Sequence, residues 1–178
     1  MPHYRIEGKL TEPMSDRDFI DGMEHGKFVQ ESHRAYCVLL YYSAVRKSEA
    51  RRALREQFRL TSKFLVFEVK RRLKHGIETP PLKIPVKAPY VDSLVSQIEK
   101  TPEAGLVFNF SDKTAYNAVR RVYHYPHFFR LSRITSFFAE GWSIAQVKNW
   151  TGLSLAALEY YVGLVDIDKM AASVAKKD

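Results

Sequence analysis

One change of hydrophobic period constrains the fold of this chain more than any other feature. Residues 64–69, Phe-Leu-Val-Phe-Glu-Val, are aromatic and β-branched, a composition that favours a strand. A His75-Gly76 pair marks a turn, and the apolar residues of 79–86 then alternate with others, as in a returning strand. Prolines in that second segment confine it to the edge of a sheet. We therefore predict one β-hairpin in this part of the chain.

The segments on both sides of the hairpin have helical periodicity instead. Between Ser32 and Ser43, apolar residues at positions 35, 38, 39 and 42 form a single helical face. Another helix begins with Ser15 as its N-cap, and further helices are predicted over residues 48–57, 89–100, 111–123, 127–140, 143–150, 154–161 and 162–176. We predict an α+β fold, mainly helical with one small antiparallel sheet, which a loop or arm at residues 1–14 precedes.

The positive charge of the chain is confined to one segment. The 178 residues carry a formal charge of +8, from 28 Lys and Arg against 20 Asp and Glu. Residues 46–75 hold eleven of these cations and three of the acids, so this segment alone accounts for +8. The other residues hold equal numbers of both signs. A diffusely basic protein is therefore excluded, and contact with a polyanion along one segment is indicated.

Composition argues against several further classes of protein. Cys37 is the single cysteine, so no intrachain disulfide can form and a reducing compartment is expected. No apolar run approaches the ~18 residues that a membrane span requires. His124 and His127 have the spacing of a metal pair, but no third ligand follows in a metal-binding pattern. We therefore expect a cytoplasmic protein that uses neither a metal nor another cofactor.

Three short motifs carry residues with useful chemistry. Arg46 lies at the break between two predicted helices, where a rigidly held guanidinium can bind a phosphate. His127 and Arg130 are one helical turn apart, so that together they could move a proton and neutralise an anion. Tyr160 and Tyr161 carry hydroxyls that become nucleophiles when a neighbour removes the proton. Each motif alone also fits an ordinary role, as a surface arginine, a capping histidine or core tyrosines.

Taken together and in this order, the motifs resemble the catalytic domain of the tyrosine recombinases, also called the phage-integrase family. That family has a Gly-x-Arg-x-Ser-Glu box after an apolar helix, which residues 44–49 match with alanine in the glycine position. A β-hairpin that carries a lysine follows, as residues 64–86 do, and then a His-x-x-Arg box, as residues 127–130 do. The family's tyrosine comes last, and residues 160–164 most resemble this region in archaeal viral or plasmid integrases.

The resemblance implies an enzyme that cleaves and rejoins DNA through a 3′-phosphotyrosine intermediate. Tyr161 would be the nucleophile that attacks the phosphodiester. Arg46 and Arg130 would hold the nonbridging oxygens as their charge grows in the transition state. His127 would assist proton transfer at the tyrosine or the phosphate.

Three of the family's roles have more than one candidate in this chain. A hairpin lysine would protonate the leaving 5′-oxygen; Lys74, beside the predicted turn, is preferred, and Lys70 is the alternative. Leu153 stands where the family has a histidine, so the Trp150 indole is an alternative hydrogen-bond donor. Because the spacing to the tyrosine is one residue short, Tyr160 is an alternative nucleophile.

Double-stranded DNA is the partner that the resemblance implies. Basic side chains of the charged segment would contact its backbone, namely Arg51, Arg52, Arg55, Arg71 and Arg72. The family assembles as a tetramer on DNA, so we expect a homo-oligomer there, with residues 162–178 as a helical tail that exchanges with a neighbouring protomer. Residues 15–161 would form the catalytic domain, acting on DNA in the cytoplasm of the cell or of a viral host.

Other interpretations use the same residues. Residues 143–161 resemble a helix-turn-helix, which would make the chain a non-catalytic DNA-binding protein. The second helix of that motif, however, has apolar residues at 155–158, where base-reading proteins use Arg, Lys, Asn or Gln. An accessory recombinase-like protein without activity is another alternative, because Leu153 replaces a histidine. A protein-interaction module would leave the arginine cluster unexplained.

Overall fold

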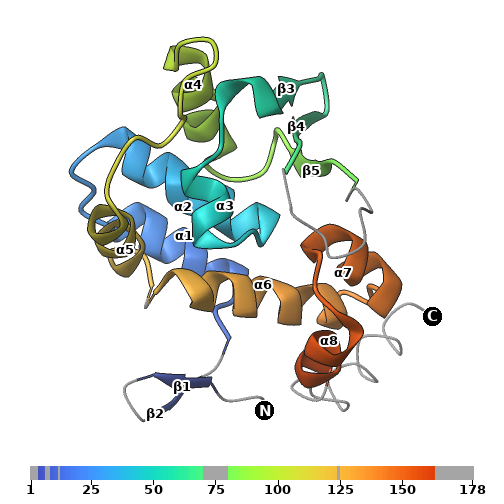
Figure 1. Cartoon of the computed structure of the whole chain (residues 1–178). Helices are drawn as coiled ribbons and strands as arrows, with labels where there is room; N and C mark the ends of the chain where they lie inside the picture. Colours follow the sequence, from blue (N-terminus) through green and yellow to red (C-terminus); the bar gives the residue numbers. More distant parts are fainter. Residues whose placement is uncertain (1–3, 7–8, 12, 70–79, 124, 163–178) are drawn as a thin grey trace.

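Helix α2 (Glu31–Ser43) forms the centre of the molecule (Figure 1). The structure, a computed structural model, describes residues 4–6, 9–11, 13–69, 80–123 and 125–162. The side chains of residues 35–41 are all buried, because other helices pack against several sides of α2. These helices are α4 (Val91–Lys100), α5 (Asp112–Arg120) and α6 (Pro126–Ala139). The helix predicted between Ser32 and Ser43 is thereby confirmed as a core element.

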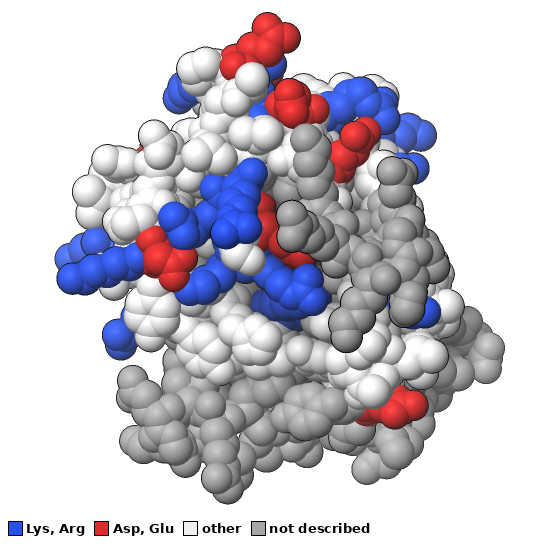
Figure 2. Space-filling view, in the orientation of Figure 1, with Lys and Arg blue, Asp and Glu red and all other residues white. Residues whose placement is uncertain are grey.

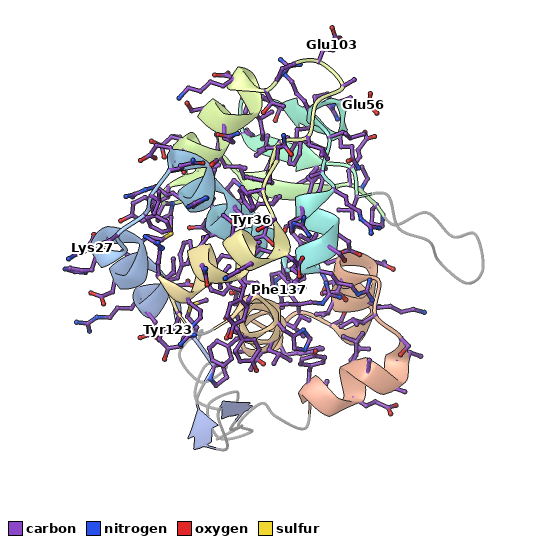
Figure 3. The ribbon with its side chains drawn as sticks, turned by 60° about the vertical axis from the view of Figure 1, so that its left-hand side comes forward. Lys27, Tyr36, Glu56, Glu103, Tyr123 and Phe137 are labelled. Carbon is purple, nitrogen blue, oxygen red and sulfur yellow. The ribbon has the colours of Figure 1, made fainter. Side chains whose placement is uncertain are left out.

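Aromatic rings fill the space around α2. Tyr36 projects from α2 into the interior (Figure 3), where its ring meets the edges of Phe108 and Phe110 at 5.3 Å between centroids. Its hydroxyl donates to the carbonyl oxygen of Lys47, 3.3 Å away. The core therefore also ties α2 to the start of the following helix.

Several helices begin at capping serines, and the N-cap predicted at Ser15 is confirmed. α1 (Asp16–His25) follows Ser15, whose hydroxyl accepts from the Asp18 N–H while the Asp18 carboxylate accepts from the Ser15 N–H. Ser111 and Ser143 cap the first turns of α5 and of α7 (Ile144–Thr151) with their hydroxyls. α6 begins at Pro126, one residue before the predicted start, because proline suits the first position of a helix. α8 covers Leu155–Val162.

The predicted hairpin is confirmed in its two strands. β4 (Phe64–Phe67) pairs antiparallel with β5 (Leu82–Pro85), with Leu65 opposite Ile84. β5 is an edge strand, as its prolines indicate, and its side chains alternate between buried and exposed. The predicted His75-Gly76 turn lies outside the described residues, together with Lys70, Arg71, Arg72 and Lys74.

The helix predicted over residues 48–57 is wrong in its second half. Helix α3 covers only Lys47–Arg51. The chain continues into a 3-10 turn, η1 (Arg55–Gln57), and then into a third strand, β3 (Phe58–Leu60), which pairs with β4. The cause is a long-range backbone pairing: the Arg55 N–H donates to the Gly105 carbonyl oxygen, and the Val107 N–H donates to that of Ala53, both at 2.9 Å. Local periodicity could not show this partner.

The N-terminal segment, expected as a loop or arm, contains a two-stranded antiparallel hairpin, β1 (Tyr4–Ile6) and β2 (Lys9–Thr11). The chain then reaches the core at Met14, whose buried N–H donates to the Ser132 hydroxyl on α6 at 2.8 Å. The predicted helix after residue 162 lies outside the described residues. Within the described part of the chain, no helix is long and apolar enough to cross a membrane.

Gly22 allows α1 to lie directly against the backbone that follows α5. A Cβ atom at this position would stand 2.5 Å from the Val122 carbonyl oxygen and 2.7 Å from its Cγ1 atom. Because neither the backbone of Val122 nor the helix can yield cheaply, only glycine permits this approach.

Replacing Gly22 should therefore destabilise the protein although glycine is a poor helix former. Alanine gains about 1 kcal/mol of helix propensity, but the clash should outweigh it and leave a net loss of about 1–3 kcal/mol. Urea unfolding of Gly22→Ala against wild type measures this, with exposed Glu24→Ala in the same helix as the control. A Gly22→Ala protein as stable as wild type would contradict the packing argument.

His33 is a buried histidine in the first turn of α2. Its ring stands edge-on to Phe110 at 5.3 Å, and its Nδ1 atom has no hydrogen-bond partner among the described residues. Burial, and then the positive charge of Arg121, lower the pKa of His33 below its ordinary 6.5. The unfolded chain therefore takes up this proton more readily than the folded one.

The free energy of unfolding should consequently decrease as the pH falls below about 6.5, the ordinary histidine pKa. Above that pH, the stability that depends on a neutral His33 should be fully present. Unfolding free energies measured at about pH 7.5 and about pH 5.5 for wild type and His33→Gln provide the test. We expect the variant to lose less stability over this interval. Parallel losses in both proteins would assign the pH dependence to other groups.

Candidate functional site

The junction between α2 and α3 is a tight turn with a left-handed residue in it. Ala44 ends α2 with φ of 52°, a conformation that glycine adopts without the penalty of a Cβ atom. The alanine side chain is fully buried, and the turn delivers Arg46 to the first position before α3. The chain thus passes from the buried end of α2 to a surface arginine within two residues of Ala44.

Arg46 is held at the surface by Glu49, one turn further along α3. Its backbone N–H donates to one carboxylate oxygen at 2.7 Å, and Nη1 donates to the other at 2.9 Å. The Arg46 side chain is half exposed, whereas that of Glu49 is only 11% exposed. A nearly buried carboxylate therefore fixes both the backbone and the guanidinium of this arginine.

Arg130 reaches the same junction from α6. Its side chain is buried, with Nη1 donating to the Ala44 carbonyl oxygen at 2.5 Å and Nη2 to that of Thr151 at 3.0 Å. The Trp150 indole N–H donates to the Ser43 carbonyl oxygen at 2.8 Å. Arg130 and Trp150 are thus brought together with the segment that carries Arg46, although they come from separate helices.

His127 lies one turn before Arg130 on α6, in an exposed position. Partial burial of the ring, and then the nearby Arg130 charge, lower the pKa of His127 below 6.5. The lowered pKa favours the neutral imidazole, the form that can accept a proton.

Tyr161 lies on α8, which packs against both α6 and α7. Its side chain is buried in the hydrophobic core cluster at 6% exposure, and Leu153 packs against the same cluster. The side chain of Tyr160 lies outside the part of the chain that the structure describes. The tyrosine helix is therefore joined to the two helices that carry Arg130 and Trp150.

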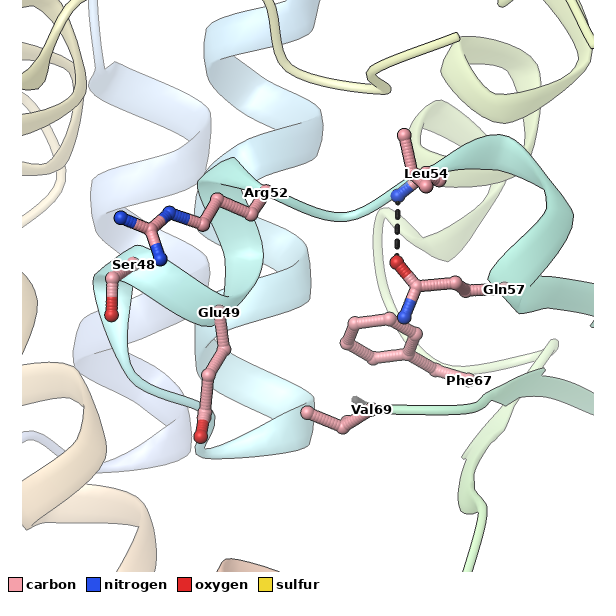
Figure 4. Close-up of a pocket in the computed structure, with 7 residues that line it drawn as sticks. All are labelled: Ser48, Glu49, Arg52, Leu54, Gln57, Phe67 and Val69. Atoms are coloured by element: carbon pink, nitrogen blue, oxygen red, sulfur yellow. Dashed lines mark hydrogen bonds between the residues drawn. The ribbon is translucent and has the colours of Figure 1, made fainter. Parts of the chain in front are cut away.

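The candidate lysines, Lys70 and Lys74, lie outside the described residues. Val69, after β4, lines a pocket of about 260 Å³ between α3 and the sheet (Figure 4). The lining residues are Ser48, Glu49, Arg52, Leu54, Gln57, Phe67 and Val69. Gln57 closes one side, where its Oε1 atom accepts from the Leu54 N–H at 2.8 Å.

The arginines that the sequence assigns to DNA differ in their surroundings. Arg51 is used within the chain: its Nη1 pairs with Asp112 at 2.6 Å, and its Nε and Nη2 donate to the Phe110 carbonyl oxygen. Lys47 pairs with Asp112 as well. The hydrogen bond from Lys47 is the largest cause of the lowered pKa of the Asp112 carboxyl. These contacts fasten α3 to α5. Arg52 is exposed, and Arg55 is half buried.

Sequence reasoning missed a second polar surface on α5. Four exposed residues share one face of this helix, namely Lys113, Tyr116, Asn117 and Arg120. The Arg120 guanidinium lies over the Tyr116 ring at 5.8 Å. Figure 2 shows Lys and Arg side chains gathered over α3 and α5 on one face. The i, i+3, i+4, i+7 spacing in the predicted helix over 111–123 was the signal that could have identified this face.

α7 and α8 form two helices around a left-handed Gly152, as the predicted helix-turn-helix requires. Leu158 and Tyr161 of the second helix are buried, however, whereas base-reading helices need exposed polar side chains. Among the described residues, no group of three or more His, Cys, Asp or Glu side chains is placed to hold a metal ion.

Solved structures share this fold at low sequence identity. The XerH site-specific recombinase, bound to its difH substrate in a pre-cleavage complex, superposes with a TM-score of 0.68 at 16% identity over 82% of this chain and 47% of that one. The XerA recombinase gives 0.66 at 15% identity over 92% and 64%. The Tn1549 transposon integrase, in complex with transposon right-end DNA, gives 0.63 at 13% identity over 93% and 65%. No family model and no curated protein sequence matches the chain.

The predicted fold is therefore confirmed: the chain has the fold of the tyrosine-recombinase catalytic domain. It spans about half to just under two thirds of the length of the three structures compared.

Proposed function

We propose that this chain binds double-stranded DNA and cleaves and rejoins it through a 3′-phosphotyrosine. The observation that carries the proposal is the meeting of Arg130 and Trp150 with the backbone of Ser43 and Ala44, two residues before Arg46. The fold thus brings the motifs of Arg46 and Arg130, which are far apart in the sequence, to the same turn after α2. Two such arginines are suited to a phosphate that gains charge during reaction.

In the proposed reaction, the Tyr161 hydroxyl oxygen bonds to phosphorus while the bond from phosphorus to the 5′-oxygen breaks. The tyrosyl proton leaves toward a base, for which neutral His127 is suited, and the 5′-oxygen takes a proton from a hairpin lysine, Lys74 or Lys70. Arg46 and Arg130 stabilise the charge on the nonbridging oxygens. A 5′-hydroxyl from a partner strand then attacks the phosphotyrosine and restores the tyrosine.

The side chains of Tyr161 and Arg130 are both buried, so this reaction requires a movement of α8, which packs against α6. The proposal accordingly includes a shift of that helix when DNA binds, which would bring the hydroxyl to the phosphate. Residues 162–178 follow directly, and their exchange with a neighbouring protomer in a DNA-bound tetramer is part of the same proposal.

DNA would lie across the face formed by α3 and α5. Arg52, Lys113 and Arg120 are exposed cations on this face that suit contacts with phosphates. Asn117 and Arg120 are residue types that read base edges. The XerH and Tn1549 structures are complexes with a difH substrate and with transposon right-end DNA, which supports DNA as the partner here.

A second candidate function is an accessory DNA-binding protein without cleavage activity. Three observations favour it: Leu153 replaces a histidine, Tyr161 is buried, and the Trp150 N–H is used within the chain. Covalent trapping of DNA distinguishes the two functions.

The enzyme should form a covalent adduct with DNA that carries a nick near the cleavage site, because the released strand then diffuses away. Denaturing gels in EDTA would measure the adduct for wild type, Tyr161→Phe and Tyr160→Phe. We expect adduct from wild type and Tyr160→Phe and none from Tyr161→Phe. The reverse result would assign the nucleophile to Tyr160, and no adduct from any of the three would leave the accessory function.

DNA affinity should depend on salt through the face of α3 and α5. Arg52→Ala and Arg120→Ala should each reduce the slope of log K against log salt by about one unit, since each removes one phosphate contact. Lys100→Ala, at the end of α4, is the control and should leave the slope unchanged. Equal slopes for all these proteins would place the DNA on another surface.

A further inference from the structure

The only polar side-chain atom of Trp150 binds the main chain of another helix. Its Nε1 atom donates to the Ser43 carbonyl oxygen at 2.8 Å, and Ser43 is the last residue of α2. Carbonyl groups in the last turn of a helix have no partner within the helix, so donors must come from elsewhere. Trp150 supplies one for Ser43, as Arg130 does for Ala44.

An aromatic cluster holds the Trp150 ring in place. The ring is T-shaped to Trp142 and to Phe137, with 5.5 Å and 5.7 Å between ring centroids, and the Trp142 and Phe137 rings stack on each other at 4.4 Å. Phe137 comes from α6 (Figure 3), so the cluster joins the end of α6 to α7. A ring packed in this way keeps its N–H direction, and a fixed donor fixes the carbonyl that it binds.

The Ser43 carbonyl stands three residues before Arg46, with only the left-handed Ala44 and the buried Val45 between them. A shift of this carbonyl would therefore turn the whole junction and carry Arg46 with it. Glu49 sets the guanidinium relative to α3, whereas Trp150 sets the junction relative to α6 and α7.

We propose that Trp150 is a positioning residue, which aligns Arg46 with Arg130 on α6, and that it is not itself a donor to the phosphate. Tryptophan has a single N–H, which cannot serve Ser43 and a transition-state oxygen together. The inference rests on the proposed function, because its consequence for reactivity is expressed through Arg46.

Trp150→Phe keeps an aromatic ring in the cluster and removes the hydrogen bond. Because small misplacements of reacting groups are costly, we expect adduct formation in a single turnover to slow by about 10- to 100-fold, with DNA affinity unchanged. Trp142→Phe is the matched control: it perturbs the same aromatic cluster but removes no bond to Ser43, so its rate should stay near that of wild type.

A double-mutant cycle with Arg46→Ala separates positioning from a direct role. If Trp150 acts through Arg46, Trp150→Phe should slow the Arg46→Ala protein much less than it slows wild type. Equal fold-losses in both backgrounds would overturn the proposal, because they would mean that Trp150 acts independently of Arg46. If wild type forms no adduct at all, the proposed function fails instead, and the geometry is tested without activity as follows.

Hydrogen exchange at the indole tests the contact itself. The chain has two tryptophans, so the indole N–H resonances are assigned by Trp142→Phe and Trp150→Phe. The Trp150 N–H should exchange slowly in the free protein, because it is hydrogen-bonded to Ser43 and its ring is packed in the aromatic cluster. Rapid exchange would overturn the proposal.

If Trp150→Phe does not fold, replacement of Trp150 by 3-benzothienylalanine in the Trp142→Phe background removes the N–H and retains the ring shape. The same loss of rate is expected there. A rate equal to that of the Trp142→Phe protein would contradict the proposal.

Discussion

The carbonyl groups at the C-terminal end of α2 need hydrogen-bond donors, and the arrangement of this molecule depends on where those donors come from. Arg130 on α6 and Trp150 on α7 supply them, so the end of the central helix is tied to two helices late in the sequence. An unpaired buried carbonyl is costly, which makes these contacts specific rather than incidental. The same contacts gather the residues of the candidate site around one turn.

Part of the basic segment stabilises the fold of the chain itself. Lys47 and Arg51 meet Asp112, and Arg51 also reaches the Phe110 carbonyl, so part of the charge holds α5 against α3. Arg52 remains exposed toward solvent. The α5 face extends the positive surface with Lys113 and Arg120. A surface that combines cations with Asn117 is better suited to duplex DNA than the apolar α8 is.

Much of the fold could be predicted, and the helix that failed did so because of a long-range contact. Local signals located the cap at Ser15 and the strands of the hairpin, because capping and alternation act over a few residues. The helix predicted over 48–57 failed because its second half pairs with residues 105–107, whose position no local pattern encodes. The motif order pointed to the site, but not to the use of Arg51 inside the chain.

The sequence by itself determined the mainly helical α+β class and the confinement of positive charge to residues 46–75. These two properties follow from short-range periodicity and composition, whereas Arg46, His127 and Arg130 are candidates because their motifs resemble those of a known family. Only the tertiary structure decided that the Trp150 indole binds Ser43, that Tyr161 is buried and that α5 exposes a polar face. Those facts depend on which helix packs against which, and packing is set by the complementary shapes and unpaired polar groups of distant segments.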